Sequence, residues 1–479
     1  MLVFNVNATP EEASIMDGTI LRETLQAILP VEVITDLARW HGVVERNRKQ
    51  DVPALVVALV LTVGSDDSGR LADAYRRYLV EAPEKAVVRG SFYNWMDAPL
   101  AELMEGLVRL GMDHADSLPK HLPEVLGGVK DWRAVDSETI TLRTPLSEEY
   151  PGSGSSAAIK VHKEFSLGCG CMVDFRLSPA KEHDARDFRV DGRYTGMGLL
   201  VDLGYASLRL IRDCHKHGVL FAIRLKKSWK PRVERIVTDE ILDELLDEVD
   251  LDTMIESGEL LLDGRPVDAD VRIGKGNKAV RARLVGVTAP DGYHFYLTNL
   301  SRQTYTPSMV SDLYRVRWEI ELDNKCDKSV AQLDQVRATT RSSLLILLYA
   351  SLLNTLLVDV LVHHDRLELA RRDENDPPRP PLHPITLGFA LRNVSLVLAL
   401  MHIKPDALPP MWNSMALVLH IVAEDPNWRG RPSILDQLRG QVAPPGRPRR
   451  KPLDQCPGSA RPYRRKEGTQ RQSGLRYVA

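Results

Sequence analysis

The stretch YRVRWEIELDNKCDK, residues 314–328, belongs to a long helix that the sequence predicts to begin at Thr306-Pro307. A period of 3.6 residues places Arg317, Glu321 and Lys328 on one stripe with the leading tyrosine, about 60° wide. A helix does not need such a stripe to fold. A solvated face with Arg317 and Glu321 paired at i, i+4 would show the same pattern. The meaning of this stretch therefore depends on carboxylates elsewhere in the chain.

Two aspartates follow strand-like runs earlier in the sequence. Asp136 ends the run 132–136, which is predicted to pair with a second short strand, 139–142, through a tight connection. Asp202 ends the strand 199–201. Polar residues at the carboxyl ends of strands in α/β sheets face the crevice where ligands bind. If the two strands are neighbours, both aspartates meet at one edge of the sheet, and the glutamate of the later helix completes the set.

Three carboxylates are suited to two hard divalent cations such as Mg²⁺ or Mn²⁺, which prefer oxygen ligands. Two such ions, about 3.5–4 Å apart, activate the attacking oxygen and stabilise the leaving oxygen in phosphodiester displacement. The carboxylates of Asp136, Asp202 and Glu321 therefore point to nucleic-acid cleavage.

The spacing Tyr314-x₂-Arg317-x₃-Glu321-x₆-Lys328 resembles the tyrosine–arginine–glutamate–lysine signature of bacterial insertion-sequence transposases of the IS-four type. These enzymes belong to the DDE class and have an RNase H-like core. The resemblance covers about residues 132–357. Supporting matches are Asp136-Ser137, Lys160-Val161-His162, His183-Asp184, Asp202-Leu203-Gly204-Tyr205 and Thr298-Asn299-Leu300.

The resemblance implies a transposase that performs cut-and-paste transposition. Asp136, Asp202 and Glu321 would be the catalytic residues and the ligands of two Mg²⁺ or Mn²⁺ ions. Water nicks the element end, the freed 3′-hydroxyl attacks the opposite strand to leave a hairpin, and the reopened end is joined to target DNA. The implied partners are inverted-repeat ends and target DNA, both double-stranded, with a homodimer in the DNA complex. A metal-dependent nuclease on the same core and an inactive DNA-binding relic are the alternatives.

Tyr314, Arg317 and Lys328 match the remaining signature positions, and the resemblance implies that they contact phosphates near the cut end. Arginine offers a planar fork and lysine a point charge for this contact. In similar enzymes an aromatic residue at the position of Trp318 supports a flipped base. Trp318 is therefore a candidate DNA-binding residue, and a core tryptophan is the alternative that we favour slightly.

The fold class predicted is α/β, with an RNase H-like mixed sheet flanked by helices. Within the insertion, an acidic helix is expected over 239–248. The predicted domains are a helical DNA-binding domain (1–125), the first part of the catalytic core (126–225), a β-rich insertion (226–301), the second part of the core (302–365), a helical C-terminal region (366–445) and a basic disordered tail (446–479).

The length, charge and apolar segments of the chain limit these interpretations. The 479 residues are long enough for two or three domains, and a net charge of −2 means that DNA binding must rest on local patches. The tail after residue 446 is one such patch, with ten Lys or Arg and two acidic residues. The apolar run 344–362 contains Asn354 and Asp359, which favours a buried core helix over a membrane span. No signal peptide is recognisable at the N-terminus, so a cytoplasmic, nucleoid-associated protein is expected.

Overall fold

The computed structural model describes residues 16–44, 50–63, 70–152, 154, 156–186, 188–237, 245–257, 260, 262–333, 336–372, 379–404, 411–428 and 433–439. The chain divides into two compact units. The first comprises Met1–Phe188, Gly196–Tyr205 and Arg317–Pro426, and the second comprises Arg189–Thr195, Ala206–Val316 and Asn427–Ala479. The basic tail predicted at 446–479 lies outside the described residues.

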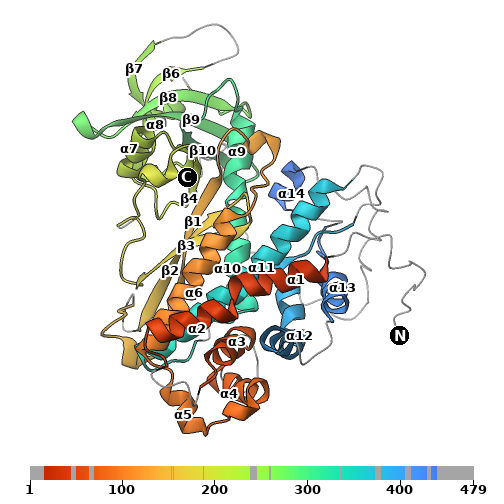
Figure 1. Ribbon diagram of the computed structural model, residues 1–479. Helices are drawn as coiled ribbons and strands as arrows, with labels where there is room; N and C mark the ends of the chain where they lie inside the picture. Colours follow the sequence, from red (N-terminus) through yellow and green to blue (C-terminus); the bar gives the residue numbers. More distant parts are fainter. Residues whose placement is uncertain are drawn as a thin grey trace, which may run out of the picture. The chain divides into compact units, whose positions relative to one another are not determined.

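The first unit contains a four-stranded sheet and a set of helices (Figure 1). Its strands are β1 (Trp132–Thr141), β2 (Ala158–Ser166), β3 (Cys171–Pro179) and β4 (Gly198–Val201). Its helices are α1 (Gly18–Ile28), α2 (Val31–Trp40), α3 (Val52–Leu61), α4 (Arg70–Glu81), α5 (Arg89–Asn94), α6 (Ala98–Ser117), α10 (Trp318–Ser329), α11 (Arg341–Arg371), α12 (Pro384–Ile403) and α13 (Trp412–Ala423).

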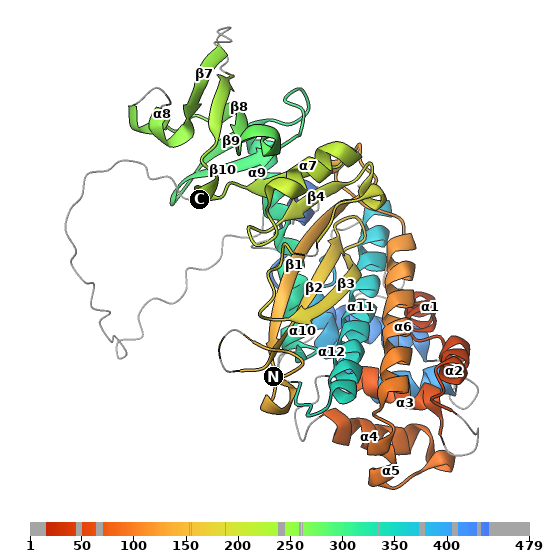
Figure 2. The ribbon, with the colours of Figure 1, turned by 90° about the vertical axis from the view of Figure 1, so that its left-hand side faces the viewer.

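The sheet of the first unit has the strand order β3-β2-β1-β4. The three strands β1, β2 and β3 pair antiparallel in a meander, whereas β4 returns parallel to β1. The sheet is therefore mixed, and helices pack against it: Figure 2 shows α6 and α11 running alongside β1, β2 and β3. The predicted α/β class with a mixed sheet flanked by helices is confirmed.

The register between β1 and β4 is set at its first pair, Trp132 opposite Gly198. The Trp132 side chain is fully buried and its indole N–H donates to the Leu126 carbonyl at 3.0 Å. The ring lies directly over Gly198, where a Cβ atom would come within 2.3 Å of it. Only glycine fits beneath this indole, so the packing of one side chain fixes the alignment of the two parallel strands.

Helix α11 is the central helix of the unit. It contacts α1, α3, α6, α10 and α12. By length and composition, α11 and α12 are each apolar enough to cross a membrane, but 94% of the α11 window is buried by surrounding protein, against 44% for α12. Residues 344–362 thus form the buried core helix that the sequence predicted.

Buried charges attach α10 to the sheet. Lys163, on β2, is 1% exposed, and its ammonium group donates to Asp323 at 2.6 Å and also to Asp327, both on α10. Asp327 in turn accepts a hydrogen bond from Thr355 of α11 at 2.5 Å. Because a buried ammonium group must keep its carboxylate partners, this cluster fixes α10 between the sheet and α11.

The second unit is a six-stranded sheet with three flanking helices and the short C-terminal α14. The strand order is β5-β10-β9-β8-β6-β7, and neighbouring strands pair antiparallel. The elements are α7 (Leu208–His217), β5 (Leu220–Arg224), β6 (Arg232–Ile236), β7 (Leu245–Asp250), α8 (Leu251–Ser257), β8 (Val267–Ile273), β9 (Val280–Ala289), β10 (Gly292–Thr298), α9 (Pro307–Val316) and α14 (Ile434–Leu438).

Three local predictions were wrong. The predicted hairpin at 132–142 is one continuous strand, because Ser137 and Glu138 pair with His162 and Val161 of β2 instead of turning. The predicted long helix through 328 is interrupted at Arg317, where the Ile320 N–H bonds to the carbonyl three residues back. The described part of the predicted acidic helix over 239–248 is strand from residue 245, since β7 pairs with β6 there.

Glu81, at the end of α4, makes the free energy of unfolding depend on pH. It is fully buried, and burial raises the pKa of its carboxyl to about 8, against the opposing charge of Arg77. The folded state therefore prefers the protonated form, and the stability this gives is present below about pH 4.5 and lost as the pH rises to about 8. We expect Glu81→Gln to increase the free energy of unfolding by about 1–3 kcal/mol at pH 8.5 and to change it little at pH 4.5.

Chemical denaturation at the two pH values measures this difference. Glu124→Gln, at an exposed position in the same unit, is the control. Equal effects of the two substitutions at pH 8.5 would contradict a buried, proton-binding Glu81.

Lys163→Met tests the attachment of α10. Removing the ammonium group leaves Asp323 and Asp327 buried without their cation, so we expect a loss of about 3–5 kcal/mol of unfolding free energy. Lys120→Met removes a partly exposed ion pair with Asp116, 2.9 Å long, and should cost less than about 1 kcal/mol. Denaturant unfolding compares the two; similar losses would mean that the Lys163 cluster does not hold the helix.

Candidate active site

Strand register brings two of the predicted carboxylates together. Val135 pairs with Val201 as the last partners of the parallel β1–β4 ladder, and Asp136 and Asp202 each follow their valine directly. Neighbouring strands lie about 4.8 Å apart, so equivalent positions on them are adjacent. Asp136 does not end its strand, as the sequence predicted, but lies in the middle of β1 at the point where β4 stops.

Asp136 has a well-defined set of partners. Its Oδ1 accepts the backbone N–H of Ser137 at 2.8 Å, and its Oδ2 accepts the side-chain amide of Asn324 at 3.1 Å. Burial raises the pKa of the Asp136 carboxyl, and the negative charges of Asp202 and Glu321 raise it further. Three carboxylates thus act on one another in a partly buried place, and an added cation would relieve their repulsion.

Glu321 lies in the first turn of α10 and is held by an arginine. Arg317, the residue that precedes the helix, donates from Nη2 to Glu321 Oε1 at 2.7 Å. Both side chains are partly buried, at 13% and 26% exposure. The positive charge of Arg317 also opposes the rise in the pKa of Asp136. Its positive charge therefore acts on two members of the predicted triad.

The donor set fits divalent metal, although its members are apart in this conformation. Among the described residues, no three His, Cys, Asp or Glu side chains come close enough to hold one metal ion. The two aspartates and Glu321 nevertheless offer carboxylate oxygens only, the ligand type that Mg²⁺ and Mn²⁺ prefer. Burial raises the pKa of Asp136, and the negative charges of Asp202 and Glu321 act in the same direction, as expected where carboxylates share one place.

The opposite face of β1 carries a polar network that supports the site. Ser137 donates to Asp184 at 3.1 Å, and Lys160 of β2 donates to the same carboxylate oxygen at 2.8 Å. His162, also on β2, hydrogen-bonds the Tyr205 hydroxyl at 2.7 Å. These residues connect β1 and β2 to the loop that follows Asp202.

Gly204 lets that loop approach closely. A Cβ atom there would lie 2.9 Å from Asp184 Oδ2. The residues around 160, 184 and 204, which match the family in sequence, thus contact one another and support β1 on the face opposite Asp136.

The signature residue Lys328 and the neighbouring candidate Trp318 both lie on α10. Lys328 is half-exposed, and its ammonium group is 3.2 Å from the buried Glu138 carboxylate of β1. Burial and the nearby Asp327 raise the pKa of Glu138 to about 7. Trp318 is 50% exposed, with the Lys325 ammonium 4.7 Å from its ring centroid. The interpretation of Trp318 as a core tryptophan was therefore wrong, because the helix turns this side chain to solvent.

Tyr314 belongs to the second unit, in the last turn of α9. Its side chain is 9% exposed, and its ring packs against Tyr296 of β10 with centroids 5.1 Å apart. The four signature residues are thus divided between the two units.

Sequence reasoning missed the residues that hold the carboxylates in place. Lys163, Asp323 and Asp327 form the buried cluster, and Asn324 contacts Asp136. A lysine at the centre of the strand-like run AIKVHKEFS is a detectable signal, because a charged residue in a buried strand needs a partner. Nothing in the sequence marks Asn324.

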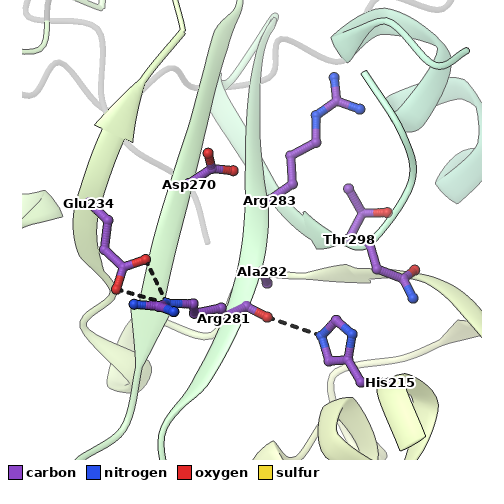
Figure 3. A pocket seen from close by; sticks show the side chains of 8 residues that line it. His215, Glu234, Asp270, Arg281, Ala282, Arg283 and Thr298 are labelled. Carbon is purple, nitrogen blue, oxygen red and sulfur yellow. Dashed lines mark hydrogen bonds and ion pairs between the residues drawn. The ribbon is translucent and has the colours of Figure 1, made fainter. Parts of the chain in front are cut away.

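The second unit contains a polar hollow whose charged residues bind one another. A hollow of about 370 Å³ is lined by His215, Glu234, Asp270, Arg281, Ala282, Arg283, Thr298 and Asn299 (Figure 3). Arg281 pairs with Glu234 at 3.0 Å, and His215 bonds the Arg281 carbonyl at 3.0 Å. Because these groups, which come from β6, β9 and α7, already bind one another, we place the candidate site at the carboxylates of the first unit instead.

Comparisons with known proteins agree with the geometry. Residues 127–357 match the family model described as the transposase DDE domain. The chain is 23% identical to the transposase for insertion sequence element IS1151 of Clostridium perfringens over 50% of this chain and 59% of the relative. It is also 23% identical to the transposase for element IS231E of Bacillus thuringiensis subsp. finitimus, over 70% of this chain and 78% of the relative.

Coverage of the relatives is incomplete. The match spans 59% of the IS1151 transposase and 50% of the IS231C transposase of Bacillus thuringiensis subsp. berliner. Among solved structures, a piggyBac transposase synaptic complex with hairpin DNA matches 90% of this chain at 12% identity, with a TM-score of 0.45. The match of residues 127–357 to the transposase DDE domain and the similarity to these relatives confirm the predicted resemblance to DDE transposases of bacterial insertion sequences.

Proposed function

We propose that this protein is a DNA transposase that cuts the ends of an insertion sequence and joins them to target DNA. The observation that carries the proposal is the register of β1 and β4, which makes Asp136 and Asp202 neighbours within the matched family domain. Glu321, whose charge acts on Asp136, is the third catalytic carboxylate. The signature of the IS-four type assigns the same three residues.

Asp136, Asp202 and Glu321 would hold two Mg²⁺ or Mn²⁺ ions. When bound, such ions supply charge that activates the attacking oxygen and stabilises the leaving oxygen. The chain's own residues orient the phosphodiester and neutralise it. Arg317 contributes a planar fork that binds either Glu321 or a phosphate, and Lys328 contributes a single charge at the rim of α10.

The reaction proceeds by two kinds of displacement at phosphorus. In the first, a water oxygen bonds to phosphorus, the P–O3′ bond breaks, and the departing oxygen takes a proton to become a 3′-hydroxyl. In the second, that hydroxyl attacks a new phosphodiester and displaces its 3′-oxygen. When the second target is the opposite strand of the same element end, a hairpin forms; when it is target DNA, the element is joined.

DNA binding is shared by several parts of the chain in this proposal. Tyr314, Arg317, Trp318 and Lys328 contact the cut end, and the helical region 1–125 and the basic tail 446–479 bind further along the duplex. Two chains pair two inverted-repeat ends, so a homodimer forms on DNA.

Removing one catalytic carboxylate tests the chemistry. We expect Asp136→Ala, Asp202→Ala and Glu321→Ala each to lower cleavage of end DNA more than about a hundred-fold, because each removes a preorganised charge from the transition state. Cleavage gels with Mg²⁺, Mn²⁺ and excess chelator measure the effect. Asp174→Ala, a partly exposed carboxylate on β3, is the matched control and should cleave normally.

Strand transfer separates a transposase from a nuclease. Pre-cut end DNA with a free 3′-hydroxyl should be joined to a target plasmid by the unaltered protein. Cleavage without any joined product would favour the nuclease, and cleavage by Asp136→Ala at the normal rate would remove the proposed site.

Lys328→Ala tests phosphate contact. The half-exposed ammonium group can bind a phosphate when it leaves Glu138. We therefore expect the variant to bind end DNA more weakly. The slope of log affinity against log salt concentration should be shallower by about 1. Binding titrations between low and moderate salt measure this slope. Lys216→Ala, an exposed lysine of α7, is the control, and an identical slope for both variants would contradict the contact.

A further inference from the structure

Asn324 is placed to fix the position of Asp136. It lies on α10 one turn beyond Glu321, and its Nδ2 donates to Asp136 Oδ2 at 3.1 Å. The other carboxylate oxygen, Oδ1, accepts the backbone N–H of Ser137 at 2.8 Å. With one donor on each oxygen, the carboxylate of Asp136 cannot rotate without losing a hydrogen bond. The helix and the strand are thereby joined at the point where the two aspartates meet.

The other end of the same amide has an unused acceptor. Asn324 Oδ1 is buried and accepts no hydrogen bond from any described residue. A buried acceptor without a donor costs about 1–3 kcal/mol, and such groups in folded proteins call for a water, an ion or a functional role. Since both ends of an amide sit on one carbon, this oxygen lies beside the Asp136 carboxylate. Amide oxygens are ligands for hard divalent cations and acceptors for the waters bound to them.

We infer that Asn324 is a positioning residue of the metal site: it holds Asp136 through Nδ2 and offers Oδ1 to the metal's bound water. This role rests on the proposed function. The role also explains why the side chain at this position of α10 is polar. The nearby acidic residues of the helix, Asp323 and Asp327, are already paired with Lys163. Asn324 belongs to neither the buried ion cluster nor the signature, and its two polar ends match the needs of a carboxylate and of a hydrated cation.

Binding of Mn²⁺ alone to the full chain, followed by the electron paramagnetic resonance signal of free Mn²⁺, tests the inference without relying on activity. We expect Asn324→Ala and Asn324→Leu each to weaken Mn²⁺ binding about ten-fold or more, the usual effect of removing a group that orients a ligand. Leucine restores the lost volume but neither polar end. Recovery of normal binding by Asn324→Leu would therefore show that the residue only fills space, and would overturn the inference.

Asn354→Ala is the matched control. Asn354 is a buried amide on α11 in the same unit, and it donates to the Val60 carbonyl at 3.1 Å. Its removal should lower Tm and leave Mn²⁺ binding unchanged. If Asn354→Ala weakens Mn²⁺ binding as much as Asn324→Ala, loss of stability accounts for both, and the positioning role falls.

Asp202→Ala separates this inference from the proposed function. If the unaltered chain binds Mn²⁺, Asp202→Ala abolishes binding and the Asn324 variants bind normally, only the role of Asn324 is wrong. If Asp202→Ala binds like the unaltered chain, or the unaltered chain binds no Mn²⁺, the metal site itself is wrong and Asn324 loses its role with it.

Discussion

The ion cluster around Lys163 is the interaction on which the candidate site depends. A lysine buried in a strand is tolerated only with its charge balanced, and Asp323 and Asp327 balance it from α10. If the helix slid or rotated along the sheet, a buried charge would lose its partner. The α10 residues Glu321, Asn324 and Lys328 take their positions from this anchor. The anchor itself takes no part in the chemistry.

The sheet of the first unit separates support from chemistry by face. On β1, Asp136 and Glu138 face α10, and the intervening Ser137 faces the network of Lys160, Asp184 and Tyr205. One face gathers negative charge, which favours a cation. The other face carries hydrogen bonds that connect β1 and β2 to the loop after Asp202. Helix α11 packs against both α6 and α10.

The sequence predicted the candidate carboxylates Asp136, Asp202 and Glu321 but not their surroundings. The register of β1 and β4 confirms that Asp136 and Asp202 are neighbours, and the catalytic role of the three residues is a proposal. The sequence also identified α11 as a core helix, since an apolar run containing Asn354 and Asp359 is poorly suited to lipid. The break at Arg317 was not predictable, because neither proline nor glycine marks it and the helical pattern continues on both sides. The continuous β1 was missed because Ser137 and Glu138 look like turn residues until their partners on β2 are known. Asn324 depends on a tertiary contact that no local pattern encodes.

The indole of Trp132 over Gly198 has a consequence for how such a chain tolerates insertions and deletions in evolution. The loops that connect β1, β2, β3 and β4 can change in length without changing which residues of β1 and β4 pair. The five positions from Trp132 to Asp136 have no such freedom. Adding or removing one residue there would turn Asp136 to the opposite face of the sheet from Asp202, since side chains alternate along a strand. Length variation should therefore be plentiful in the loops and absent from this short interval, and a protein that breaks this rule should have lost the adjacency of the two aspartates.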